Sequence, residues 1–237
     1  MYKTIVSIIL WPIWYLFFIP SLIIIFVLIY LIPRKYFFYI VKPVSWLCCF
    51  FAGQWLVKEN SPPPKENQPY LYLFNHVSMF DQFMIGAYIS HYITAIGAAE
   101  IFNYPIWGHV VTKYGGIPIV RQHLKRAIES LLLVEEAIKS GVSFIIAPEG
   151  TRTLNGEMGE FKKGPFHLAK NTGVTLVPIA LLGGLEAKPK NDWRLKPGVL
   201  TTRFGKPIKK EEYIHLTVEE ISDLVKKRIE LLIQTGD

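Results

Sequence analysis

The first 57 residues of this 237-residue chain contain no aspartate or glutamate, although the whole sequence has 19 acidic residues. The same segment holds only four basic residues, Lys3, Arg34, Lys35 and Lys42. The net charge of +7 is therefore divided almost evenly between this front segment and the rest of the chain. This division excludes one uniform nucleic-acid-binding surface, and a hydrophobic content of 51% excludes intrinsic disorder.

Cysteine is nearly absent. The two cysteines, Cys48 and Cys49, are neighbours inside an apolar stretch. Metal sites and disulfide frameworks use cysteines that are spaced along the chain. We therefore expect both thiols to be reduced and either packed or lipid-facing, and we expect no metal site.

Several motifs that carry chemistry are also missing from the sequence. It has no Walker A loop, no G-x-G-x-x-G fingerprint, no H-E-x-x-H zinc motif and no G-x-S-x-G nucleophile elbow. Nucleotide hydrolysis, dinucleotide redox chemistry, zinc-dependent hydrolysis and serine hydrolase chemistry therefore lose their usual support.

The front segment contains a charge-free run from Thr4 to Pro33, longer than the ~20 residues that a helix needs to cross a bilayer. Four of the six tryptophans lie in residues 1–57, and such rings prefer the headgroup level of a membrane. Pro12 and Pro20 disfavour one straight helix. We therefore expect a retained helical hairpin that turns near Pro20, with monotopic embedding favoured over true spanning.

The basic residues that flank this run predict its orientation. A turn near its middle would bring Lys3 and the Arg34–Lys35 pair to the same side, as the positive-inside tendency prefers. We expect residues 1–57 to embed in the cell inner membrane, monotopic or multi-pass, and residues 58–237 to form a catalytic domain that faces the cytoplasm.

A polar, proline-rich connector at residues 60–69 precedes a region in which short β-type runs alternate with helical patterns. Strands are expected at 70–74, 92–96, 117–120, 142–146, 175–181 and 199–204, and helices from about Met79, at 124–139 and at 217–232. Such alternation predicts an α/β fold, with a mostly parallel sheet flanked by helices and preceded by the membrane-embedded helical hairpin. Catalytic groups should then lie in loops at the ends of strands.

His76 and Asp81 follow directly on the first of these strands. Positions five residues apart point in different directions on a regular helix, so the two side chains can meet only if His76 is on the loop and Asp81 begins the helix. An aspartate that holds one ring nitrogen leaves the other free to accept a proton, as a general base for an alcohol requires. By itself the pair is a weak motif.

A second cluster, Glu149 to Arg152, follows the expected strand at 142–146 and leads into Lys162 and Lys163. Arginine offers a forked donor for phosphate, and Lys162 or Lys163 adds a point charge near the start of a helix. Glu149 could either order Arg152 or accept a hydrogen bond from a substrate hydroxyl. A solvated charged loop with a surface ion pair is the alternative.

The sequence resembles, in order and spacing, the four conserved blocks of the glycerolipid acyltransferases, and most of all their bacterial 1-acylglycerol-3-phosphate acyltransferase branch. The matching blocks are Asn75–Asp81, Gly116–Arg121, Pro148–Arg152 and Val177–Ala180. The resemblance implies that His76 is the catalytic base and Asp81 its partner. It further implies that the acceptor's glycerophosphate is held by Glu149, Gly150, Thr151 and Arg152, with help from Arg121, and Lys163 is included in this predicted site.

The implied reaction is transfer of a fatty acyl group from acyl-carrier protein or coenzyme A to the sn-2 hydroxyl of lysophosphatidic acid. Such a reaction needs no cofactor and no metal, because the thioester is already activated. Val120 stands where many family members carry an acidic or polar residue. An acyltransferase for another lyso-lipid, such as a lyso-ornithine lipid or a lysophospholipid, therefore remains an alternative, as does a catalytically silent membrane lipid-binding protein.

Basic runs at 188–196 and 206–210 bear on the partners of the chain. Contact with anionic lipid headgroups explains them as well as a nucleic-acid surface would, and it agrees better with the apolar front segment. We therefore expect membrane lipids, the lysophospholipid acceptor and the thioester donor as partners, and no nucleic acid.

Overall fold

The computed structural model of the chain describes residues 1–120 and 123–235 and contains a seven-stranded sheet with the order β1-β7-β6-β2-β5-β3-β4. The strands are β1 (Gln54–Glu59), β2 (Tyr70–Phe74), β3 (Ile93–Ala98), β4 (Ile117–Ile119), β5 (Ser143–Ile146), β6 (Thr175–Leu182) and β7 (Gly198–Phe204). Every neighbouring pair is parallel except β6 and β7, which run antiparallel. The expected mostly parallel α/β fold is therefore confirmed.

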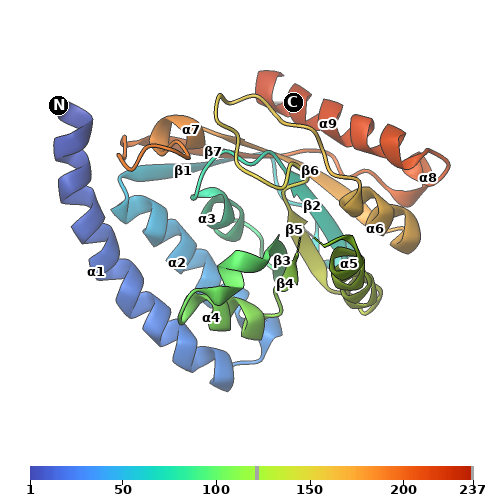
Figure 1. Cartoon of the computed structure of the whole chain (residues 1–237), viewed down its shortest axis with the longest axis horizontal. Coiled ribbons are helices and arrows are strands. Elements are labelled where there is room, and N and C mark those ends of the chain that lie inside the picture. Colours follow the sequence, from blue (N-terminus) through green and yellow to red (C-terminus); the bar gives the residue numbers. More distant parts are fainter. Residues whose placement is uncertain (121–122, 236–237) are drawn as a thin grey trace.

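Helices cover both faces of this sheet (Figure 1). They are α1 (Tyr2–Leu31), α2 (Phe38–Phe51), α3 (Asp81–Gly86), α4 (Trp107–Tyr114), α5 (Leu124–Lys139), α6 (Gly164–Thr172), α7 (Gly184–Ala187), α8 (Lys210–Tyr213) and α9 (Val218–Thr235). On α9 the buried residues Ile221, Val225, Ile229 and Leu232 recur at helical spacing, so one stripe of this helix packs on the sheet.

The central strand β2 separates two apolar cores. Tyr70, Tyr72 and Phe74 point into a core shared with α1, α2 and α3, whereas Leu71 and Leu73 point into a core shared with α5, α6 and α9. This division follows from the alternation of side chains along a strand. The five residues of β2 are all buried, which places the loop after Phe74 at the centre of the fold.

The predicted turn near Pro20 is wrong, because α1 continues through Pro12 and Pro20 for 30 residues. The turn of the helical hairpin instead lies between Leu31 and Phe38, where α1 passes to α2. Each proline removes a helical hydrogen bond, but contacts along the helix hold it together. Trp14 is buried and its indole Nε1 donates to the carbonyl of Cys48 at 3.0 Å.

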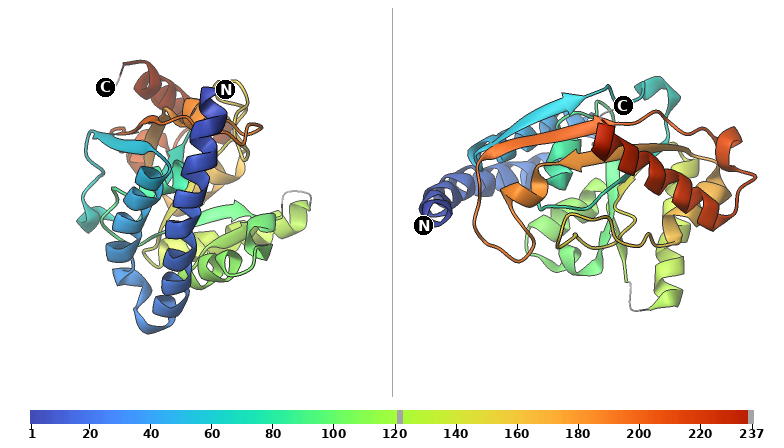
Figure 2. Two further views of the ribbon diagram at one scale, coloured as in Figure 1. Left: turned by 90° about the vertical axis from the view of Figure 1, so that its left-hand side faces the viewer. Right: turned by 90° about the horizontal axis from the view of Figure 1, so that it is seen from above.

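The continuous helix also separates the basic residues that the sequence pattern was expected to bring together. A helix of 30 residues is ~45 Å long, so Lys3 lies at one end of α1 and the Arg34–Lys35 pair follows its other end. Figure 2 shows α1 along the outside of the molecule. Lys3 and the Arg34–Lys35 pair therefore lie at opposite ends of α1 and not close together.

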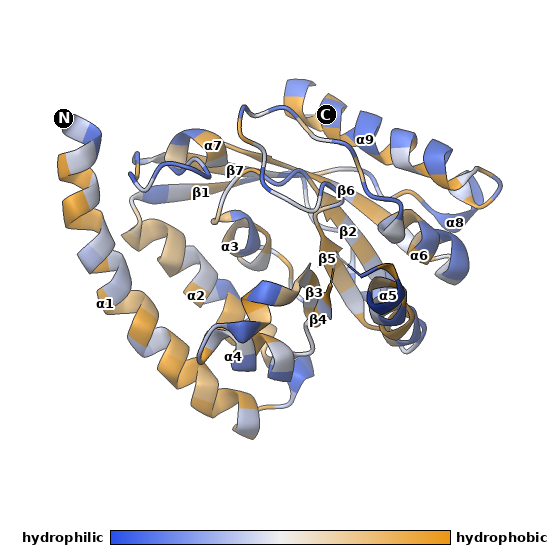
Figure 3. Ribbon diagram, viewed as in Figure 1, coloured by the Kyte–Doolittle hydropathy of each residue, from blue (hydrophilic) through white to orange (hydrophobic). Residues whose placement is uncertain are grey.

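By length and composition α1 could cross a membrane, although the same test admits core helices and leader sequences. Only 11% of its most apolar stretch is buried, so α1 is not a core helix in this structure. In Figure 3 the apolar colour covers much of α1 and α2. The large exposed side chains on α1 include Ile8, Leu16, Ile24 and Val27.

Strand β1 lies at the junction between the front segment and the rest of the chain. It begins at Gln54 and ends at Glu59, so it crosses the predicted limit between residues 57 and 58. All six of its residues pair with β7. The front segment is therefore joined to the sheet by a strand as well as by helix packing.

Candidate functional site

The side chains of His76 and Asp81 meet as expected. The imidazole Nδ1 of His76 lies 2.6 Å from Oδ2 of Asp81, which is the first residue of α3. The backbone N–H groups of Val77 and Ser78 also donate to this carboxylate, at 2.9 to 3.1 Å. The loop between β2 and α3 therefore wraps around Asp81, which allows a pair five residues apart to touch.

The hydrogen bonds to Asp81 define which nitrogen of His76 is free. Burial raises the pKa of the Asp81 carboxyl, whereas the hydrogen bonds from His76, Ser78 and Val77 act in the opposite direction. Because the carboxylate already accepts two backbone N–H groups, it acts as an acceptor, and Nδ1 of His76 donates to it. In the neutral form of this ring Nε2 is the nitrogen without a proton, on a side chain that is 29% exposed. It can accept a proton from a bound hydroxyl.

The loop after β2 is also tied to the neighbouring strand β6. The amide group of Asn75 donates to the carbonyl of Leu181 at 3.0 Å and accepts from the N–H of Leu181 at 2.7 Å. These two bonds hold the residue before His76 against the sheet, so the position of the imidazole is set from both sides.

Glu149 links this loop to the loop after β5. Its Oε1 accepts the backbone N–H of His76, and its Oε2 accepts the backbone N–H of Gly159, both at 2.8 Å. The N–H of Thr153 in turn donates to the carbonyl of His76 at 2.8 Å. Both oxygens of the buried Glu149 carboxylate thus contact backbone amides, a positioning role that its place in the sequence did not indicate.

His76 and Asp81 line one end of a cleft of about 560 Å³, together with Gly150 and Arg152. The rest of the cleft is walled mostly by apolar side chains from the front segment, α3, α4 and the sheet. Those from α1 and α4 are Phe18, Leu22, Ile25, Ile29, Trp107, Val110 and Val111. Phe18 and Ile29 lie ~16 Å apart along the helix axis, so the cleft is long as well as apolar.

The other residues predicted for the site are distributed differently. Thr151 is exposed, and its hydroxyl accepts a hydrogen bond from Nζ of Lys190 at 2.8 Å. Lys163 does not line the cleft; its ammonium pairs with Glu219 of α9 at the surface. Arg121 lies outside the described residues. The cleft therefore brings together His76, Asp81, Gly150 and Arg152 from the predicted set.

Metal-binding chemistry finds no support in the part of the chain that the structure describes. No group of three or more histidine, cysteine, aspartate or glutamate side chains there is placed to hold an ion. The absence of a metal or cofactor from the reaction stays a prediction.

Comparison with known proteins finds a family model and several relatives that match this chain. A family model described as acyltransferase matches residues 56–182. A curated 1-acyl-sn-glycerol-3-phosphate acyltransferase of Cocos nucifera is 37% identical over 159 residues, which are 65% of this chain and 52% of that protein. A protein of the same name from Pseudomonas aeruginosa is 30% identical over 148 residues, which are 62% of this chain and 55% of that protein. The chain thus spans about half the length of these curated relatives.

A solved structure shares the fold. The crystal structure of the 1-acyl-sn-glycerophosphate (LPA) acyltransferase PlsC from Thermotoga maritima matches with a TM-score of 0.81. The match covers 98% of both chains at 22% sequence identity, so it describes the architecture, including the front segment.

Proposed function

Because this chain belongs to the acyltransferase family, we propose that it transfers a fatty acyl group from an acyl thioester to the sn-2 hydroxyl of lysophosphatidic acid, forming phosphatidic acid. The observation that carries the proposal is the His76–Asp81 pair, 2.6 Å apart, at the polar end of a long apolar cleft. The names of the relatives support the choice of acceptor.

In the proposed reaction Nε2 of His76 takes the proton of the acceptor hydroxyl as its oxygen attacks the thioester carbonyl. The tetrahedral intermediate then collapses, the carbon–sulfur bond breaks, and the imidazolium returns the proton to the departing thiolate. Asp81 keeps the ring oriented and stabilises its positive charge. A histidine base of this kind contributes about 10²- to 10⁴-fold to the rate.

The cleft supplies binding for the other parts of the substrates. Arg152 lies at its polar end, where a guanidinium can bind a phosphate through two parallel hydrogen bonds. The apolar walls suit a fatty acyl chain, because burying each methylene gains about 0.8 kcal/mol. Fixing the phosphate and the chain holds the hydroxyl against the carbonyl carbon.

The proposal includes a location. Lysophosphatidic acid and phosphatidic acid are membrane lipids, and the exposed apolar side chains of α1 can embed in a bilayer. We place the protein at the inner membrane with its catalytic domain in the cytoplasm, where acyl-carrier protein or coenzyme A delivers the acyl group. No cofactor or metal takes part in this scheme.

The test is a panel of acceptors assayed with the purified protein in detergent or vesicles. Lysophosphatidic acid, lysophosphatidylethanolamine and a lyso-ornithine lipid are each offered with an acyl-coenzyme A and an acyl-carrier protein donor. We expect transfer to lysophosphatidic acid, and a loss of about 10²- to 10⁴-fold in kcat for His76→Ala. His167→Ala, which changes an exposed histidine on α6, is the matched control.

The outcomes separate the alternatives. If the protein prefers another lyso-lipid, the proposed acceptor is wrong but the role of His76 as the base is retained. Near-normal transfer by a folded His76→Ala protein would remove His76 from the chemistry. Equal background rates for the parent, His76→Ala and His167→Ala with every acceptor and donor would favour a silent lipid-binding protein.

A further inference from the structure

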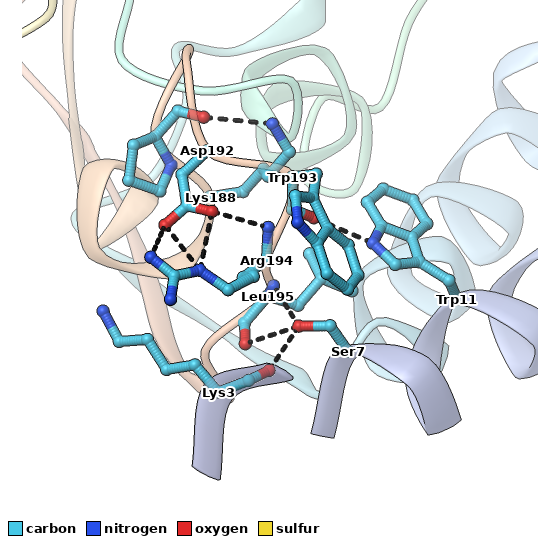
Figure 4. A network of polar contacts seen from close by, with 9 residues as sticks. Lys3, Ser7, Trp11, Lys188, Asp192, Trp193, Arg194 and Leu195 are labelled. Carbon is cyan, nitrogen blue, oxygen red and sulfur yellow. Dashed lines mark hydrogen bonds and ion pairs between the residues drawn. The ribbon is translucent and has the colours of Figure 1, made fainter. Parts of the chain in front are cut away.

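A basic strap, defined here as residues 188–196, connects α7 to β7 and contains Lys188, Lys190, Arg194 and Lys196. Its far half is fixed to the first turns of α1 (Figure 4). The hydroxyl of Ser7 accepts the N–H of Leu195 at 2.8 Å, and the indole N–H of Trp11 donates to the carbonyl of Trp193 at 2.9 Å. These two contacts fix the position of the strap, although most of its residues are half-buried rather than buried.

The near half of the basic strap touches both loops of the catalytic site. The hydroxyl of Ser78, in the loop that wraps Asp81, donates to the carbonyl of Lys188 at 3.2 Å. Nζ of Lys190 donates to the hydroxyl of Thr151, the residue next to Arg152, at 2.8 Å. The strap follows β6, and β6, β2 and β5 are adjacent in the sheet. Three neighbouring strands thus deliver the strap, the His76 loop and the Arg152 loop to one place.

The positive charges at this place lack acidic partners among the residues that the structure describes. Among the described residues, Nζ of Lys188 donates only to the carbonyl of Pro189, at 3.0 Å. Burial lowers the pKa of the Lys188 ammonium, the charge of Arg152 lowers it further, and Asp192 opposes both to a smaller extent. Arg152 itself has no ion pair within the described ranges.

The two nearest carboxylates are already engaged. Asp192 accepts three hydrogen bonds from the Arg194 guanidinium, and these bonds contribute to lowering its pKa to about 2. Glu149 contacts backbone amides through both of its oxygens. Two cations that repel each other, beside the loop that carries His76 and with Asp192 already bound by Arg194, form a site that an anion would stabilise.

We propose that Lys188 binds the phosphate of the acceptor opposite Arg152, with Lys190 as a weaker outer contact. The phosphate would bridge the loop after β5 and the basic strap after β6, so its two cations come from separate segments. This inference rests on the proposed function. It also gives α1 a part in acceptor binding, because Ser7 and Trp11 hold the segment that carries Lys188.

The experiment compares Lys188→Gln with Lys206→Gln in the full-length protein. Lys206 is exposed and follows β7, whose antiparallel direction puts it at the opposite edge of the sheet, so the control makes the same charge change away from the site. We expect the KM for lysophosphatidic acid to rise about 10- to 100-fold in Lys188→Gln, with kcat and the donor's KM little changed. Lys188→Arg should recover most of the loss, and Lys190→Gln should give a smaller rise.

An unchanged acceptor KM in folded Lys188→Gln would overturn the inference. A rise in the KM for acyl-coenzyme A alone would also overturn it, because the lysine would then bind the donor's phosphates. If Lys188→Gln does not fold, Lys190→Gln provides the test. An acceptor KM in Lys190→Gln that equals the acceptor KM in Lys206→Gln then overturns the inference.

Binding is also measured without turnover, which separates this inference from the proposed function. We expect lysophosphatidic acid to raise the thermal midpoint of the parent protein more than neutral 1-acylglycerol does, and we expect this difference to disappear in Lys188→Gln. If the proposed function fails, the parent protein will transfer acyl groups no faster than His76→Ala does, while lysophosphatidic acid still raises its thermal midpoint more than 1-acylglycerol does. If the difference in thermal midpoint between the two lipids is equal in Lys188→Gln and Lys206→Gln, the inference about Lys188 is overturned and the proposed function is not.

Discussion

Glu149 shows how the partners of a side chain limit its role. Each of its two oxygens accepts one backbone N–H, from His76 and from Gly159. A carboxylate so engaged holds the loop of His76 in place, whereas the resemblance to glycerolipid acyltransferases implied that it contacts the glycerophosphate. The two roles have different kinetic consequences, because a positioning group affects kcat and a binding group affects KM.

The variant Glu149→Gln distinguishes these roles. Glutamine keeps one acceptor oxygen but turns an NH2 group toward the second backbone N–H, so one amide loses its partner. We expect kcat to fall about 10- to 100-fold, the acceptor KM to change little, and the free energy of unfolding to fall by about 1–3 kcal/mol. Steady-state kinetics and urea unfolding measure both effects.

The control for this variant is Glu157→Gln, which makes the same substitution at an exposed residue of the same loop. It should leave both kinetic constants close to those of the parent. A raised acceptor KM with normal kcat in Glu149→Gln would instead support direct contact between Glu149 and the acceptor.

Local spacing was enough to predict the His76–Asp81 contact but not the partners of Lys163. His76 and Asp81 lie at a junction between a strand and a helix, where five residues suffice to turn the chain. Lys163 pairs with Glu219, which is 56 residues away in the sequence, and no local pattern indicates which helix α9 will approach. The role of Lys188 was hidden for the same reason. The basic strap is held by loops that follow two other strands, because Ser78 contacts Lys188 and Thr151 contacts Lys190.

Among the helices and strands, the hydrophobic pattern predicted both an amphipathic helix and a fully buried strand. The helix expected at 124–139 and the strand expected at 70–74 have the same bounds in the structure. Strand β1 was missed because its residues continue the apolar front segment, and the bend near Pro20 was wrong because proline weakens a helix locally while packing acts along its whole length. α4 is eight residues long, which gives little periodicity to detect.

Helix α1 forms one wall of the cleft, and this predicts an effect on acyl-chain preference. Ser21 lines the cleft, whereas Ile23 on the same helix is exposed. Ser21→Trp should obstruct the cleft and shift preference toward shorter acyl donors by about ten-fold, because an occupied apolar pocket excludes added methylenes. Competition between acyl thioesters of graded length measures this preference.

Ile23→Trp is the matched control, since it adds the same ring to the outer side of α1. It should retain the chain-length preference of the parent. If both variants or neither changed the preference, the acyl chain would not occupy the part of the cleft beside Ser21.

For the molecule as a whole, the outer side of α1 is the surface that we expect to enter the membrane. Leu16 is 79% exposed there. Leu16→Asp should weaken binding to phospholipid vesicles by about ten-fold or more, because an acidic side chain is costly in the apolar layer. Sedimentation with vesicles measures the bound fraction, and the cleft should be unaffected because Leu16 does not line it.

The control, Leu231→Asp, makes the same substitution at an exposed leucine of α9, a helix that packs on the other core. It should bind vesicles as the parent does. Loss of binding in Leu231→Asp but not in Leu16→Asp would place the membrane against the opposite side of the molecule. Removing residues 1–57 is a less specific test, because it also deletes the first four residues of β1.

The pairing of β1 with β7 affects the order in which the protein can form during synthesis. The two strands pair along their length, and Arg203 of β7 donates to Glu59 of β1 across 144 residues of sequence. A chain still attached to the ribosome can form α1 long before β7 has been made. Until then β1 lacks the strand it pairs with, so the strand link between the front segment and the sheet forms only when the last strand emerges.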